Sequence, residues 1–85
     1  MRVLFLAALL TATATAQAAL GASPVSKTAC PASHPVKGNI VDRGKDKGAK
    51  IYHTPDSRSY KATHPERCFR TAAEAQQAGY KPPKK

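Results

Sequence analysis

Cys30 and Cys68 are the two residues best suited to chemistry, and they are the only cysteines in the chain. One pair allows one intramolecular disulfide. The alternatives are a reactive thiol or a metal-ligand pair. However, there is no Cys-x-x-Cys spacing, and neither cysteine follows a recognisable helix start that would lower its pKa. We therefore predict a structural disulfide, which would stabilise the fold by ~4 kcal/mol in the chain-entropy model.

The histidines form no recognisable site. His34, His53 and His64 show neither an His-x-His nor an His-x-x-x-His arrangement, and two of them precede a proline, which favours extended loops. A Cys–His nucleophilic pair would need a free cysteine. We therefore expect a non-enzymatic protein with no catalytic residue, no metal, no cofactor and no small-molecule substrate.

Residues 1–18 have the pattern of a cleavable signal peptide. Arg2 precedes a short apolar run at residues 3–10, and a tract of small residues follows with processing sites around Ala16 and Ala18. The alternative is a membrane anchor, but the run is about half of the roughly 20 residues that span a bilayer. We predict export to the periplasm or medium, with no transmembrane segment in the mature chain.

The mature chain of about 67 residues has room for one small domain. We predict a flexible lead-in at residues 19–29, a folded domain at residues 30–82 and a basic tail at residues 83–85. The folded part has few apolar residues, so we expect its core to be only marginally stable without a disulfide bond. We expect a monomer.

Local patterns predict a small α+β fold with a two- or three-stranded antiparallel sheet and one short C-terminal helix. Residues 39–41 and 49–53 are β-prone and flank a turn-rich segment, which indicates a hairpin. Residues 59–62 are a possible third strand, and residues 67–69 are an extended piece. Thr71 and Glu74 form a capping box, residues 72–78 favour helix, and Gly79 suits the helix end.

Short motifs in a fixed order resemble the sunset domain, a small domain found beside some bacterial nuclease domains. They are Lys-Gly-Asn-Ile at 37–40, Lys-Ile-Tyr-His-Thr-Pro at 50–55, Tyr60 with Thr63, Glu-Arg at 66–67 with Phe69, and Glu-Ala at 74–75 with Ala-Gly-Tyr at 78–80. The resemblance covers most of the mature chain and implies a compact accessory domain, without naming an activity.

A more remote similarity to the Ada-type metal-binding domain is informative through its departures. The four zinc cysteines of that family would fall at His53, Ser57, Pro83 and beyond Lys85. One possible ligand cannot form a closed tetrahedral zinc site. Methyl transfer is also excluded, since the accepting cysteine would be His53. The comparison implies a shared scaffold in which the disulfide takes over the stabilising role of the metal.

Charge is the remaining functional signal. Without Arg2, 13 basic residues stand against 5 acidic ones, so the mature net charge is about +8. The candidate anion-binding residues are Arg43, Lys45, Lys47, Lys50, Arg58, Lys61, Arg67, Arg70, Tyr52 and Tyr60. Phosphate contacts combined with stacking on tyrosine predict sequence-independent binding of DNA or RNA. The alternatives are anionic envelope polymers, and an accessory domain that binds another protein.

Overall fold

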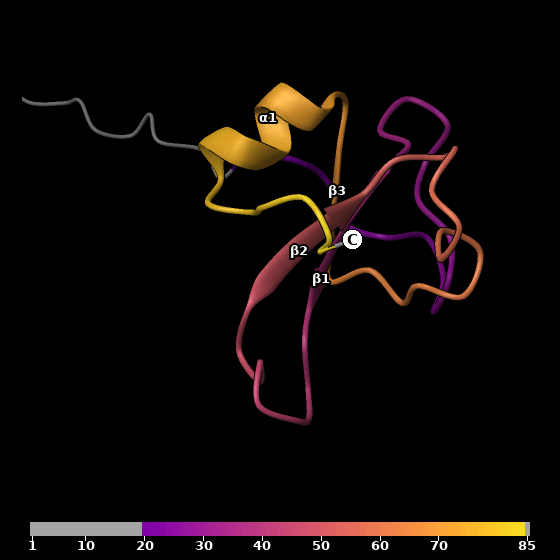
Figure 1. The fold of residues 1–85 in the computed structure, drawn as a ribbon. Coiled ribbons are helices and arrows are strands. Elements are labelled where there is room, and N and C mark those ends of the chain that lie inside the picture. Colours follow the sequence, from indigo (N-terminus) through magenta and orange to yellow (C-terminus); the bar gives the residue numbers. More distant parts are fainter. Residues whose placement is uncertain (1–19, 85) are drawn as a thin grey trace, which may run out of the picture.

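The computed structural model describes residues 20–84, so the predicted signal peptide lies outside the described residues. The sheet has three antiparallel strands, β1 (Val36–Ile40), β2 (Lys50–His53) and β3 (Arg67–Phe69), in the order β2-β1-β3. A single helix, α1 (Ala72–Gln77), follows β3. In Figure 1 the β1–β2 hairpin extends away from the end of the sheet at which α1 lies. The predicted α+β class is confirmed.

The third strand is β3, and the alternative at residues 59–62 is wrong. Residues 59–62 form successive turns, in which the amide of Tyr60 bonds the carbonyl of Ser57 at 3.1 Å and the amide of Thr63 bonds the carbonyl of Tyr60 at 3.1 Å. Residues 67–69, for which the sequence predicts only an extended piece, pair with β1 in the register Val36 to Phe69.

β1 begins at Val36, three residues before the predicted start, and it passes through Gly38. A Cβ atom at this position would lie 2.7 Å from Cε2 of Phe69 and 2.9 Å from Cε2 of Tyr80. These separations are too short for any side chain, so only glycine lets the two rings pack on the strand. The ring centroids of Phe69 and Tyr80 are 5.1 Å apart.

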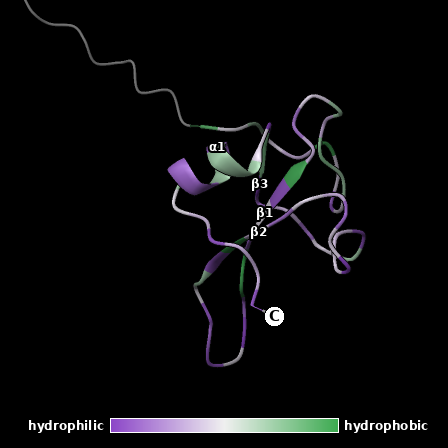
Figure 2. Ribbon diagram, turned by 45° about the horizontal axis from the view of Figure 1, so that its top comes forward, coloured by the Kyte–Doolittle hydropathy of each residue, from purple (hydrophilic) through white to green (hydrophobic). Residues whose placement is uncertain are grey.

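The core lies between the sheet and α1. Its buried members are Val36, Tyr52, Phe69, Ala75 and Tyr80. Figure 2 shows that the turn of the β1–β2 hairpin is mostly hydrophilic, so the hairpin tip adds little to the core. A core of five side chains is small, as the composition predicted.

α1 is capped at its N-terminus in a manner close to the predicted capping box. The Thr71 side chain accepts a hydrogen bond from the amide of Glu74 at 3.0 Å. The carboxylate of Glu74 accepts from the amide of Arg70 at 2.8 Å, one residue before the expected partner. Gly79 has φ of 94°, the left-handed conformation that suits glycine after a helix.

Both outer edges of the sheet are covered by segments near the ends of the described chain. Ala22, within the predicted lead-in, exchanges two backbone hydrogen bonds with Cys68 of β3, at 2.8 and 2.9 Å. On the other edge, Lys81 accepts from the amide of Tyr52 and donates to the carbonyl of Lys50, both at 2.9 Å. No long free edge of β2 or β3 is therefore left for uncontrolled pairing.

Within residues 20–84, no helix has the length and apolar character required to cross a membrane.

Candidate anion-binding surface

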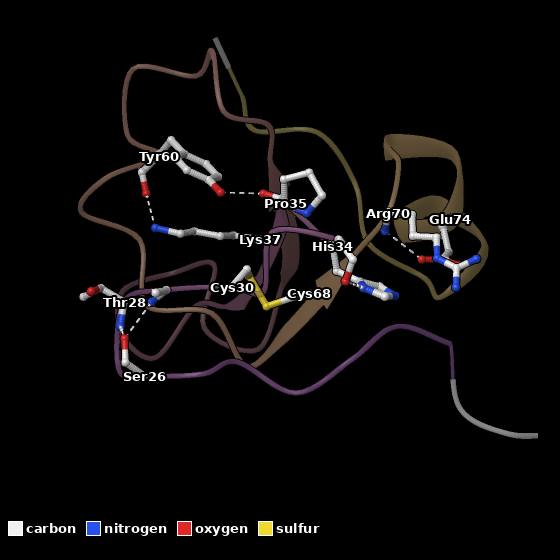
Figure 3. The surroundings of a disulfide bond; sticks show 12 residues. Ser26, Thr28, Cys30, His34, Pro35, Lys37, Tyr60, Cys68, Arg70 and Glu74 are labelled. Atoms are coloured by element: carbon white, nitrogen blue, oxygen red, sulfur yellow. Dashed lines mark hydrogen bonds between the residues drawn. A yellow bond between two sulfur atoms is a disulfide. The ribbon is translucent and has the colours of Figure 1, made fainter.

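The disulfide between Cys30 and Cys68 is present, as predicted, with a Cα–Cα distance of 5.7 Å. It links the segment before β1 to the buried middle residue of β3 (Figure 3). No free cysteine occurs among the described residues. While the bridge is closed, the chain therefore offers neither a thiolate nucleophile nor a thiolate metal ligand.

Lys37 is a buried cation whose sequence signal is only its place in the Lys-Gly-Asn-Ile motif. It is 3% exposed and faces away from the Val36 and Gly38 side of β1, because side chains alternate along a strand. Its Nζ donates to the backbone oxygen of Tyr60 at 2.7 Å and lies 4.2 Å from the centroid of the Tyr60 ring (Figure 3). Burial lowers the pKa of Lys37. No carboxylate among the described residues forms an ion pair with it.

Both tyrosines proposed as stacking platforms have structural partners. Tyr52 is buried in the core, and its hydroxyl accepts a hydrogen bond from Nε2 of Gln76 at 3.1 Å. The hydroxyl of Tyr60 donates to the oxygen of Pro35 at 2.5 Å, and the Tyr60 ring contacts the Lys37 ammonium. These rings therefore contribute to packing, and we assign neither a stacking role below.

His53 lies beside Lys37 in the sheet, since the two residues are partners in the β1–β2 register. The Nδ1 atom of His53 is 3.2 Å from Oγ of Ser57, in the loop that follows β2. Desolvation by burial lowers the pKa of His53, and the positive charge of Lys37 lowers it further. The histidine is therefore held in its neutral form to a lower pH than an ordinary histidine.

A cavity of about 500 Å³ opens next to this histidine. Its lining residues come from the end of β2, the following loop and the C-terminal segment: His53, Ser57, Arg58, Ser59, Pro83 and Lys84. No Asp or Glu is among them. Nζ of Lys84 also lies 3.4 Å from a carboxylate oxygen of Asp46, in the β1–β2 hairpin. Lys84 thus connects the cavity to the hairpin.

The other predicted cations have several different positions. Arg43, Lys45 and Lys47 are exposed between β1 and β2, and Lys61 is exposed in the 54–66 loop. Lys50 is exposed at the start of β2, with its Nζ 5.3 Å from the centroid of the Tyr80 ring.

Two predicted cations do not join the hairpin group. Arg67 is half-buried and donates to the oxygens of Leu20 at 2.9 Å and Gly21 at 3.2 Å, so its role is to hold the N-terminal segment. Arg70 directly precedes the N-cap of α1, and α1 lies at the opposite end of the sheet from the hairpin tip (Figure 1).

The carboxylates neutralise little of this charge. Among the described residues only two ion pairs occur, Asp42 with Arg43 at 3.8 Å and Asp46 with Lys84 at 3.4 Å, and both are exposed. Glu66 accepts instead from the amide of Ile40 at 2.6 Å, and Glu74 serves the helix start. Exposed ion pairs contribute little and are easily exchanged. The surface therefore keeps a large excess of unpaired positive charge.

Among residues 20–84, no group of three or more His, Cys, Asp or Glu side chains is placed to hold a metal ion.

Residues 14–82 match the family model described as ArfC. None of the curated proteins and none of the solved structures matches the chain significantly. The resemblance to the sunset domain stays a prediction, because the description of the matching family states neither that domain nor a ligand.

Proposed function

The chain belongs to the ArfC family, whose description names no ligand, and we propose from its surface that it is a small, exported, non-enzymatic module that binds nucleic acid without reading the base sequence. The observation that carries this proposal is the excess of exposed cations over available carboxylates. Glu66 and Glu74 accept from backbone amides, and neither forms an ion pair with a cation among the described residues. Cationic side chains without acidic partners suit contacts with phosphate groups.

The structure also bears on how such a module would bind. Its tyrosine rings are engaged in packing, so the phosphate backbone is the part of a nucleic acid that this surface suits. Contacts with phosphates position a nucleic acid and carry no sequence information. The disulfide is consistent with export, because such bonds persist in oxidising compartments.

Binding of labelled single- and double-stranded DNA across a salt series tests this function. With four phosphate contacts we expect the affinity to fall by about 100-fold between 50 and 200 mM salt. The protein should be kept oxidised, since the disulfide links β3 to the segment before β1. Anionic lipid vesicles and anionic wall polymers at matched salt serve as competitors.

Charge reversal locates the surface. Replacing Lys45 and Lys47 with glutamate changes the hairpin, and replacing Lys27 and Arg70 with glutamate makes the same change in net charge elsewhere. We expect the hairpin variant to lose much more DNA affinity than its matched control. No binding at low salt would refute the proposal. Equal losses in the two variants would refute a defined surface, and stronger binding to vesicles or wall polymers would reassign the partner to the envelope.

A further inference from the structure

The cavity beside His53 has the chemistry of a phosphate site. Arg58 offers a planar fork of N–H donors, Lys84 an ammonium group, and Ser57 and Ser59 hydroxyl groups. Arginine and lysine are the usual phosphate partners in proteins, and hydroxyls complete the shell of hydrogen bonds. Ser57, Arg58 and Ser59 are consecutive, whereas Lys84 lies far from them in the sequence and is brought to them by the return of the C-terminal segment along β2.

We propose that this cavity binds one phosphate group of a nucleic acid backbone. The inference deepens the proposed function and rests on it, since it locates the phosphate contact away from the hairpin tip. The cavity volume of about 500 Å³ leaves room for a phosphate, its ester substituents and water. A free anion and a phosphodiester share this chemistry, so the test separates them.

Lys37 supports the assignment through its position beside His53. It is almost fully buried, has no carboxylate partner among the described residues, and is the register partner of His53, which lines the cavity. A buried charge is screened less than an exposed one, and the Lys37 charge already acts on His53 at the edge of the cavity. An anion bound in the cavity would meet the cationic groups of the loop after β2 and of the C-terminal segment, with Lys37 adding to the local positive potential.

Asp46 is the carboxylate that competes for one of these groups. Its contact with Lys84 is 3.4 Å long, and the two side chains are 50% and 77% exposed. Such an exposed pair contributes little stability. A phosphate in the cavity can therefore take Lys84 from Asp46 at small cost. This exchange would release the Asp46 end of the pair and alter the hairpin, which is a readout away from the cavity.

The test is an NMR titration of the full oxidised chain, labelled with ¹⁵N, at constant ionic strength. The probes are inorganic phosphate and a dithymidine phosphodiester, with chloride as the reference anion. We expect saturable shifts at the amides of His53, Ser57, Arg58 and Ser59, with a smaller shift at Asp46. Arg58→Gln together with Lys84→Gln should weaken binding of either probe by about tenfold or more. Lys27→Gln, at an exposed cation of the segment before β1 and outside the candidate set, is the control and should leave binding unchanged.

The outcomes distinguish a phosphodiester site, a free-anion site and the absence of a site in the cavity. Saturation by the diester that the double variant abolishes supports the proposal. Saturation by inorganic phosphate alone overturns the nucleic-acid assignment in favour of a free-anion site. Shifts that never saturate, or that the double variant retains, overturn the proposal that the cavity binds phosphate. The proposed DNA binding is tested separately, by the salt series on the unmodified chain and by the hairpin variants, so it can hold even if the cavity proposal fails.

Discussion

Removing the disulfide should cost the protein a large part of its stability. Cys30 and Cys68 are separated by 38 residues. Closing a loop of that length removes conformational entropy from the unfolded chain and raises its free energy by ~4 kcal/mol in the chain-entropy model. The total stability of a domain of about 65 residues is on the order of 3 to 10 kcal/mol. The bridge therefore contributes a large part of the total, because apart from Cys68 the core has only five buried hydrophobic residues.

Thermal and urea denaturation, followed by circular dichroism, measures this contribution. The variant is Cys30→Ala with Cys68→Ala, compared with the oxidised and the reduced wild type. We expect a melting temperature about 15 to 30 °C lower in both bridge-free forms. Tyrosine fluorescence is an independent probe, since the chain has three tyrosines and no tryptophan.

The comparison of the two bridge-free forms separates the cross-link from packing. Cys68 is fully buried, so its replacement by alanine also removes packing contacts. The reduced wild type keeps both sulfur atoms and loses only the bond. A loss below about 1 kcal/mol in the reduced wild type would refute the reasoning, because it would show that the small core suffices without the loop constraint. Adding reductant to the double variant should change nothing.

Three further predictions follow from individual contacts. Gly38→Ala should destabilise the fold by about 1 to 3 kcal/mol in urea denaturation, because the new methyl group overlaps two buried rings, and a variant as stable as the wild type would contradict the packing argument. Thr71→Ala should cost about 1 kcal/mol in the same assay through loss of the helix cap, and an unchanged midpoint would contradict this. The pKa of His53, measured as its NMR titration midpoint, should lie below the ordinary value of 6.5. The contribution of His53 to stability should therefore fall as the pH drops from 6.5 towards that midpoint. Lys37→Met should raise the midpoint, and a wild-type midpoint above 6.5 would refute the lowered pKa of His53.

The local features of the fold could be predicted because their signals are short-range or unique. A single cysteine pair permits one bridge, and that bridge is present. The turn-rich segment between two β-prone runs specified the hairpin, although β1 starts earlier than its β-propensity suggested. Thr71 and Glu74 indicated the start of α1, and Gly79 indicated its end close to Gln77. These ends were predictable because helix caps depend on side chains close in sequence.

The third strand could not be located in this way. Residues 59–62 include Tyr60, which favours strands, and residues 67–69 are only three residues long. β-propensity reflects packing against neighbours as much as the backbone itself. Here the pairing with β1 and the bridge to Ala22 decide the outcome, and both join residues far apart in the sequence.

The candidate site was only partly accessible from the sequence for the same reason. Counting charges showed an excess of cations, but the excess alone does not show which cations are free. Arg67 is used to hold the N-terminal segment, and Lys37 is buried. Lys84 was assigned to a basic tail, whereas the C-terminal segment returns along β2 and places it with Arg58.

The covered edges of the sheet restrict how this small domain can recognise a partner. A partner that adds a strand needs unpaired backbone groups at an edge. Ala22 occupies the outer edge at Cys68, and Lys81 bonds the backbone of Lys50 and Tyr52 on the other side. Strand addition at these positions would have to displace a segment that is already paired. The recognition proposed above would therefore use side chains on the hairpin and around the cavity beside His53. The segment between β1 and β2 carries three cations against two carboxylates, and the cavity is lined by hydrogen-bond donors with no carboxylate, so of the two surfaces the cavity suits an anionic partner better.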